Sequence, residues 1–294
     1  MEVVNALRAS ARKAFAKLER RTGLSRWRFR DAPKYESPTP AELESIERAL
    51  AELGVQVQDY APSPESFRAF QAAEWFPLDY HGGTRGKVWD EKLLEHWISS
   101  ECLGLMRFGP GDVFVDVAAA TSPWVKALRE RKNIDAHAID LGVVPAAYRH
   151  LPYYRIEDAT HTSFEDASVA GAALHCAYEM FTGDHDVAFL DEAARVLRPG
   201  GKVVIVPLYM HTHYCAYASP EHFGKGNSPP SAKEYVRLDS TNVPSSRKYD
   251  AATLVTRVLG RVESLGMSYR LLALRNESEL GRDIYCHFIL EVTR

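Results

Sequence analysis

Three aspartates stand at or near the ends of short apolar runs. Asp116 belongs to "VFVDVAAATS", Asp140 ends "HAID" and Asp158 lies in "IEDAT". If the runs are strands of one parallel sheet, their carboxyl ends share the edge at which such folds bind ligands. Ionised carboxylates only accept hydrogen bonds. This edge therefore suits a ligand that carries hydroxyl, amine or ammonium groups.

The loop that follows Asp116 contains no glycine. A dinucleotide pyrophosphate needs glycine there for close backbone approach, and free N–H groups at the start of the next helix. Here the loop carries Ala118, Ala120 and Ser122, and Pro123 removes one donor. These residues argue against a phosphate-bearing cofactor. They allow a ligand that needs only a floor of small residues.

Groups that could accept a proton follow the next two strands along the chain. His175 and Glu179 come after "VAGAAL", and His211, His213 and Cys215 come after "KVVIVPLY". Histidine is suited to proton removal near neutral pH. The run of two histidines and a cysteine also has metal-ligand residue types, and alternate residues of an extended segment face one way. Its spacing matches no zinc pattern, so no metal is predicted.

The elements that position these residues alternate between strand and helix from residue 112 onward. Strands are expected at "DVFVDVAA", "DAHAIDL", "YYRIEDA", "VAGAALHCA" and "KVVIVPLY", with helices at "PWVKALRERK" and "DVAFLDEAARVLRPGG". Such repetition predicts a doubly wound, parallel sheet. The last two strands, "SYRLLALRN" and "DIYCHFILEVT", are joined too closely for a crossover helix. They should be antiparallel neighbours.

Taken in order, these segments resemble the class I S-adenosylmethionine-dependent methyltransferases. "VFVDVAAATSPW" resembles the first motif of that family, and "HAIDL" resembles the end of its second strand. "IEDATHTSFEDASVAGAALHCAYEMF" resembles the stretch beside adenine, and "FLDEAARVLRPGGKVVIV" the helix and Pro-Gly-Gly strand entry. The resemblance covers roughly residues 85–294. It implies a mostly parallel, seven-stranded α/β sheet with a terminal antiparallel strand, preceded by an N-terminal helical extension.

The resemblance implies S-adenosylmethionine as the cofactor. Asp116 would orient the loop and lie near the methionine amine, and the strand end at His175 and Cys176 would receive the ammonium group through a backbone carbonyl. Alanine is strained at positive φ, where glycine is not. The floor under the methionine part, where the family has glycines, would be formed by Ala118, Ala120 and Ser122.

The nucleoside part has its own set of implied contacts. Asp140 would accept both ribose hydroxyls, with Leu141 against adenine. Asp158 would accept from the adenine amino group, and the N–H of Ala159 would face a ring nitrogen. Lys87, in a glycine-rich loop before the sheet, could reach the cofactor carboxylate or an anionic substrate; a solvated surface position is the alternative.

Methyl transfer to an oxygen usually needs a general base. We expect His213 or His211 in this role, with Glu179 as a partner. The segment 214–250 is rich in Tyr, Ser, Pro and Lys and is interpreted as a lid-like insertion. The predicted function is O-methylation of a small-molecule or glycan-like acceptor. The alternatives are N-methylation of a small metabolite and a non-catalytic, cofactor-binding or interaction protein of the same fold.

Bulk properties set the remaining expectations. The 294 residues are 46% hydrophobic with a net charge of −3, which gives no overall attraction to nucleic acid. The scattered cysteines and the absence of an 18-residue apolar run favour a cytoplasmic protein. Residues 2–22 form a basic amphipathic pattern, read as a helix packed on the main domain or as a membrane-surface or polyanion-binding arm. The expected division is an extension at 1–84 and a methyltransferase domain at 85–294.

Overall fold

A computed structural model describes residues 27–294 except residues 143 and 145. By internal contacts the chain forms two compact units, each described here by itself. Unit 1 comprises the chain up to Leu53, Glu179–Asp184 and Tyr209–Leu254; unit 2 comprises Gly54–Tyr178, His185–Leu208 and Val255–Arg294. The predicted helix at residues 2–22 lies outside the described residues. The predicted domain boundary after residue 84 stays a prediction.

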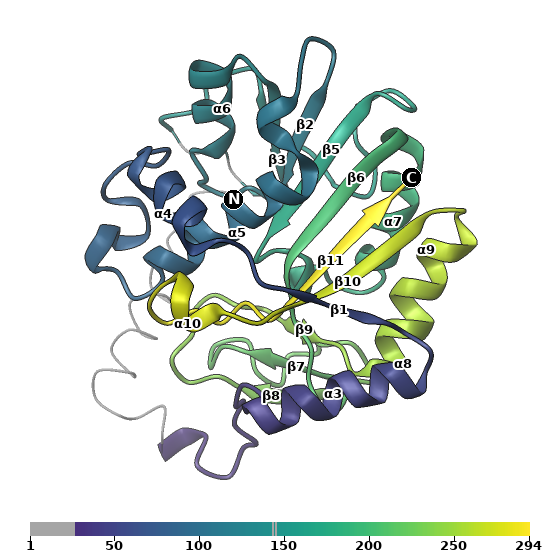
Figure 1. The fold of residues 1–294 in the computed structure, drawn as a ribbon. Coiled ribbons are helices and arrows are strands. Elements are labelled where there is room, and N and C mark those ends of the chain that lie inside the picture. Colours follow the sequence, from purple (N-terminus) through teal and green to yellow (C-terminus); the bar gives the residue numbers. More distant parts are fainter. Residues whose placement is uncertain (1–26, 143, 145) are drawn as a thin grey trace, which may run out of the picture. The chain divides into compact units, whose positions relative to one another are not determined.

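Within the described residues, unit 2 is built on an eight-stranded sheet of order β1-β10-β11-β6-β5-β2-β3-β4 (Figure 1). The strands are β1 (Val57–Tyr60), β2 (Val113–Val117), β3 (Asp135–Asp140), β4 (Tyr154–Ile156), β5 (Val169–His175), β6 (Leu197–Leu208), β10 (Ser268–Leu274) and β11 (Phe288–Thr293). β11 runs antiparallel to β10 and to β6. The predicted mostly parallel sheet with a terminal antiparallel strand is confirmed.

The sheet has one strand more than the seven expected. β1 pairs parallel with β10, from Val57 opposite Leu271 to Tyr60 opposite Leu274. Its four residues are mostly half-buried and lack the continuous apolar character of the central strands. A short edge strand of this kind leaves little pattern in the sequence, so it went unpredicted.

Helices cover both faces of this sheet. They are α4 (Pro64–Ala72), α5 (Trp89–Leu103), α6 (Trp124–Lys132), α7 (His185–Val196), α9 (Gly260–Ser264) and α10 (Glu277–Leu280), with short turns η1 (Tyr80–Arg85), η2 (Leu105–Arg107), η3 (Tyr178–Met180) and η4 (Leu254–Leu259). Phe114 of β2 packs in a core cluster with residues of α5 and α6, whereas Val115 and Val117 line a small cavity against α7. Side chains alternate along a strand. Asp116 is therefore directed, like Phe114, toward the α5 face.

Helix α5 is buried almost all the way around. Asp90 and Glu91 lie in its first turn, where acidic groups favour the helix dipole, and Gly104 ends it in a left-handed conformation. Four of its apolar side chains are buried: Leu93, Leu94, Trp97 and Ile98. Polar side chains of the same helix are buried as well, which the apolar pattern did not indicate. They are Glu91, Glu95, His96, Ser99 and Ser100.

Unit 1 contains helix α3 (Pro40–Glu52), a three-stranded sheet and the short helix α8 (Ala251–Thr253). The sheet has the order β8-β7-β9, formed by Lys233–Val236, Cys215–Ala218 and Ser246–Lys248. Thr39 and Glu42 close a capping box at the start of α3, and Pro40 occupies the first turn.

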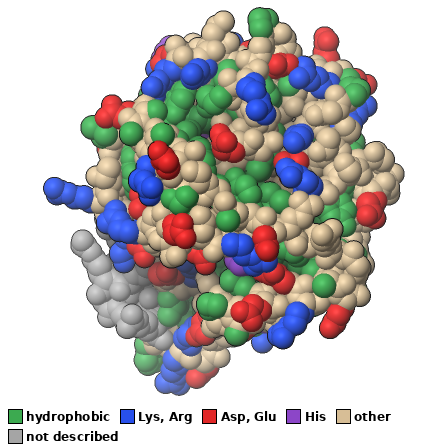
Figure 2. All heavy atoms as spheres, viewed as in Figure 1, with side chains coloured by type: hydrophobic (Ala, Val, Ile, Leu, Met, Phe, Trp, Pro, Cys, Tyr) green, Lys and Arg blue, Asp and Glu red, His purple; other side chains and the backbone are tan. Residues whose placement is uncertain are grey.

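The surface carries both charge signs. Figure 2 shows Lys and Arg side chains interspersed with Asp and Glu over the visible face. Within the part of the chain that the structure describes, no helix has the length and apolar character needed to cross a membrane.

A buried ion pair in unit 2 is expected to matter for stability. Arg257 donates to both carboxylate oxygens of fully buried Asp186, at 2.8 and 2.6 Å. Replacing Arg257 with methionine removes both of these bonds from a buried carboxylate and should lower the free energy of unfolding by about 3–5 kcal/mol. The control is Arg261→Met, whose partner Asp191 is 44% exposed; it should cost at most about 1 kcal/mol. Equal losses in urea denaturation would contradict this assignment.

Candidate active site

The loop between β2 and α6 has the backbone shape of a glycine loop without glycine. Ala118 and Ala120 both adopt left-handed conformations, with φ of 54° and 47°. The N–H of Ala120 donates to Asp140 Oδ2 at 2.8 Å, and the N–H of Ser122 donates to the Ala119 carbonyl at 2.8 Å. These bonds hold the loop at the carboxyl edge of the sheet. The alanines therefore occupy the conformation that family glycines would occupy without strain.

Asp116 and His175, the predicted ends of two strands, meet beneath this loop. His175 Nδ1 lies 3.0 Å from Asp116 Oδ1, and His175 Nε2 lies 2.8 Å from Ser99 Oγ. β2 and β5 are parallel neighbours, which brings both side chains to one edge. Burial, followed by the Lys92 charge, lowers the pKa of His175 to about 3. The ring is therefore neutral at physiological pH, and burial raises the pKa of Asp116 to about 6.

Four polar residues of α5 line the same place, and the sequence analysis missed them. Lys92, Glu95, His96 and Ser99 are spaced i, i+3, i+4 and i+7, which puts them on one face of a helix. The His96 ring stacks on the ring of His175 at 3.9 Å. The signal was a polar stripe at helical spacing within an otherwise apolar helix that directly precedes the sheet.

Lys92 supplies the positive charge of this cluster. Its Nζ donates to Glu95 Oε1 and Oε2 at 2.9 and 3.0 Å, and its side chain is 13% exposed. Burial acts against the ammonium, but the Glu95 carboxylate outweighs that effect and raises the pKa of Lys92 well above its ordinary value. An ammonium has three donors. Lys92 therefore stays charged and keeps capacity for a further anionic partner.

These groups border one cleft of about 200 Å³ in unit 2. The cleft is lined by Tyr80, His81, Lys92, Glu95, His96, Asp116, residues 118–122, His175 and Cys176. The structure thus brings together the predicted residues Asp116, His175 and Cys176 with the whole alanine loop. A cation beside two acids suits a ligand that carries both a carboxylate and an ammonium group.

Asp140 stands at the tip of β3. Its two oxygens accept from the N–H groups of Ala120 and Gly142, at 2.8 and 2.6 Å. Each carboxylate oxygen has a second lone pair for a hydroxyl donor. Leu141 beside it is 66% exposed, as an apolar surface for a planar ring would be. The roles of Asp140 and Leu141 in binding ribose and adenine stay predictions.

The remaining cofactor predictions have different surroundings. Asp158 Oδ1 accepts from the N–H and the hydroxyl of Thr160, at 2.9 and 2.8 Å, and the backbone bond lowers the pKa of Asp158. Ala159 is buried. Lys87 is exposed and is not among the residues that line the cleft. The cleft lysine is Lys92, five residues further along the chain.

The predicted proton acceptors lie in unit 1, where the structure brings His211 and His213 together. Their ring centres are 4.4 Å apart, and both Nδ1 atoms lie near the hydroxyl of Thr212, at 3.2 and 3.3 Å. His213 Nε2 is 2.7 Å from Tyr235 Oη. Burial, followed by His213, lowers the pKa of His211. Glu179 is buried within the same unit, and its partnership with the histidines stays a prediction.

Comparison with known families fits this architecture. Residues 115–205 match a family model described as a methyltransferase domain. The chain contains a class I S-adenosylmethionine-dependent methyltransferase domain. The matched segment runs from β2 to β6 and includes the alanine loop, Asp140, Asp158 and His175. The predicted enzyme class and cofactor are confirmed.

Several solved structures are similar to the methyltransferase chain. One is the complex between the Haloferax volcanii Trm112 methyltransferase activator and a proposed methyltransferase (18% identity, 70% of this chain, 92% of that chain, TM-score 0.42). Another is the Burkholderia thailandensis 1,6-didemethyltoxoflavin-N1-methyltransferase (13% identity, 81% of this chain, 92% of that chain, TM-score 0.45). A third is the Streptomyces coelicolor geranyl diphosphate C-methyltransferase (14% identity, 88% of this chain, 99% of that chain, TM-score 0.39). No curated protein matches the chain.

The left-handed alanines give a stability prediction. An alanine in this conformation costs roughly 1–2 kcal/mol, against about 0.4–1 kcal/mol for the extra freedom of glycine in the unfolded chain. Ala118→Gly should therefore raise the free energy of unfolding by about 0.5–1 kcal/mol. Ala119 is buried and is absent from the positive-φ residues, so Ala119→Gly is the control and should destabilise. The prediction is wrong if both variants lose stability in denaturant titrations.

Proposed function

We propose that this methyltransferase transfers the methyl group to a hydroxyl of a small-molecule or glycan-like acceptor. The observation that carries the proposal is the hydrogen-bonded pair of His213 and Tyr235 in unit 1, 2.7 Å apart and flanked by His211. A hydroxyl is a poor nucleophile until its proton is removed, and a neutral imidazole is the side chain best suited to that step. When bound, S-adenosylmethionine supplies the activated methyl group.

The cleft of unit 2 supports a specific placement of the cofactor's methionine part. The carboxylate would pair with Lys92, and the ammonium group would lie against Asp116 and the end of β5 at His175 and Cys176. The donor set fits, because the cleft offers one fixed cation and buried acceptors to a zwitterion. The floor would be the alanine loop, whose Cβ atoms leave space for a sulfonium but little for a pyrophosphate.

The nucleoside part would extend toward the tips of β3 and β4. Asp140 would accept the ribose hydroxyls with the lone pairs that its two backbone donors leave over. Leu141 would pack on adenine, and Asp158 with Ala159 would contact the adenine edge. Lys87 would then be a surface residue or a contact to an anionic acceptor. Lys92 replaces it as the residue that we assign to the cofactor carboxylate.

Aromatic and polar residues of unit 1 support the choice of a polar acceptor. Tyr35, Tyr217 and Tyr235 lie ring to ring, with centres 4.7 Å apart between Tyr35 and Tyr217 and 6.4 Å apart between Tyr35 and Tyr235. Aromatic faces beside hydrogen-bonding groups suit sugar rings and other compact polar molecules. In this proposal His213 accepts the hydroxyl proton, His211 lies beside it, and Glu179 supports them.

The non-catalytic alternative was motivated by the missing glycines. The left-handed conformations of Ala118 and Ala120 weaken that motive, because the loop keeps its shape with alanine. N-methylation differs from the proposal in the proton step. An amine nucleophile can be neutral without a base, so an N-methyltransferase would tolerate loss of His213 better than an O-methyltransferase.

The assignment of Lys92 is testable by ligand selectivity. Lys92→Gln should weaken binding of S-adenosylhomocysteine at least about tenfold, because a charge-assisted bond to the carboxylate is lost. Binding of methylthioadenosine, which lacks the amino-acid part, should not change, and this checks that the variant is folded. Lys87→Gln is the matched control and should bind both ligands normally. Calorimetry that shows the loss in Lys87→Gln instead would overturn the assignment.

The base is tested by separating turnover from affinity. His213→Ala should lower turnover by about 10²-fold or more while the affinity for S-adenosylhomocysteine stays the same. Asp140→Ala should show the opposite pattern and weaken cofactor binding by about 1–3 kcal/mol. A labelled-methyl transfer screen on cell extract supplies the acceptor for the assay. Unchanged turnover in His213→Ala would remove this residue from the mechanism and favour an amine acceptor.

A further inference from the structure

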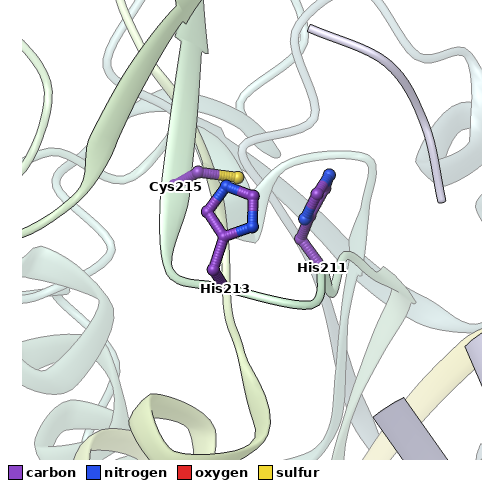
Figure 3. Close-up of side chains that lie close together, drawn as sticks. All are labelled: His211, His213 and Cys215. Carbon is purple, nitrogen blue, oxygen red and sulfur yellow. The ribbon is translucent and has the colours of Figure 1, made fainter. Parts of the chain in front are cut away.

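Two histidines and a cysteine project from alternate positions where the chain enters β7. The chain bends at Thr212 and His213 before the strand begins at Cys215. Figure 3 shows the side chains of His211, His213 and Cys215 gathered on the inside of this bend. One ring nitrogen of each histidine and the Cys215 sulfur lie within 4.8 Å of one another. All three residues belong to unit 1.

These distances are close to those of a tetrahedral zinc site. Zinc binds histidine nitrogen at about 2.0–2.1 Å and cysteine sulfur at about 2.3 Å, which places neighbouring ligand atoms roughly 3.3–3.8 Å apart. The three atoms therefore need to approach one another by up to about 1.5 Å. Both histidine side chains are only partly buried, so rotation can contribute to that movement.

Hydrogen bonds to neighbouring hydroxyl groups orient the two imidazole rings, as hydrogen bonds usually orient histidines that bind a metal. His213 Nε2 is hydrogen-bonded to Tyr235 Oη at 2.7 Å, which can hold the ring as the tautomer with Nδ1 free of its proton. The Nδ1 atoms of both histidines lie within 3.3 Å of one oxygen, Thr212 Oγ1, so they converge on one place. A hydroxyl has a single proton and can donate to only one of them at a time.

The thiol has a neighbour that favours its ionised form. Cys215 is fully buried and lies directly opposite Lys248 in the antiparallel pair of β7 and β9. Burial raises the pKa of the thiol to about 12, and the Lys248 ammonium acts in the opposite direction. A thiol that binds a divalent ion loses its proton. The thiolate so formed would offset part of the positive charge at this place.

We propose that His211, His213 and Cys215 form a binding site for a divalent ion of the zinc class. Two imidazoles and a thiolate are borderline and soft donors, which select zinc over magnesium or calcium. The fourth position is left for water or another small ligand.

A second cluster of metal-ligand types, His96, Asp116 and His175, does not carry the same inference. Both ring nitrogens of His175 already have partners, at 3.0 Å to Asp116 and 2.8 Å to Ser99. Each nitrogen of His175 thus has a partner of its own, whereas the Nδ1 atoms of His211 and His213 share the single hydroxyl of Thr212. Internal hydrogen bonds therefore account for the second cluster without a metal.

Zinc and the acceptor proton would compete for His213. A coordinated imidazole has no lone pair with which to remove a proton, so ion binding should inhibit methyl transfer. This consequence rests on the proposed function, whereas ion binding itself does not. The site would thus let free zinc suppress the enzyme by occupying its base.

Cobalt(II) is the probe for the site, because a bound thiolate gives it a charge-transfer absorption in the near ultraviolet. The full chain without an affinity tag should bind one equivalent of cobalt with that band, and zinc should displace it. Cys215→Ser should abolish the band and weaken zinc binding at least about tenfold. Cys102→Ser, a cysteine of unit 2, is the control and should behave as the wild type.

His211→Gln provides a second variant in case Cys215→Ser does not fold. It should keep the native circular dichroism spectrum and also lose stoichiometric binding. No cobalt binding by the wild type, or the same band in Cys215→Ser, would overturn the proposal. Cobalt binding by a protein that shows no zinc-sensitive methyl transfer supports the ion site and contradicts the assignment of His213 as the base.

Discussion

Polar and charged groups buried beside the loop after β2 are the constraint on which this site depends. Asp116, Glu95 and His96 are almost completely withdrawn from water, and each such group is costly unless it is hydrogen-bonded or paired. Lys92 of helix α5 partners Glu95 and, through its carbonyl, His96, and His175 at the end of β5 partners Asp116. The result is a rigid polar pocket inside an apolar core. A cofactor can bind there without rearrangement of the polar side chains.

The alanine loop shows that a backbone conformation typical of glycine can be adopted by another residue type. A glycine-rich loop reaches left-handed conformations freely, whereas here Ala118 and Ala120 reach them against a steric cost. The bond from Ala120 to Asp140 and the pairing of Ala119 with β3 hold the loop in place. Tertiary contacts thus replace local freedom.

The sequence was most informative where burial is complete. The central strands are continuous apolar runs, so their order of appearance and the carboxyl-edge position of Asp116 and His175 could be predicted. The edge strand β1 could not, because four half-buried residues leave no pattern. Lys92 was missed for a related reason. Its polar stripe lies inside a helix that reads as core, and only the fold shows that this face meets the ends of β2 and β5.

Histidines in the two units show why residue type alone does not define a site. His175 is enclosed, and both of its ring nitrogens have partners within the protein. Its pKa is lowered to about 3, so it does not take up a proton at neutral pH. His213 is partly exposed, and its Nδ1 shares one hydroxyl with the neighbouring His211. Reactivity requires a lone pair that the fold does not already use. In the function that we propose, this difference in exposure makes His175 a positioning residue and His213 the group that exchanges a proton or an ion.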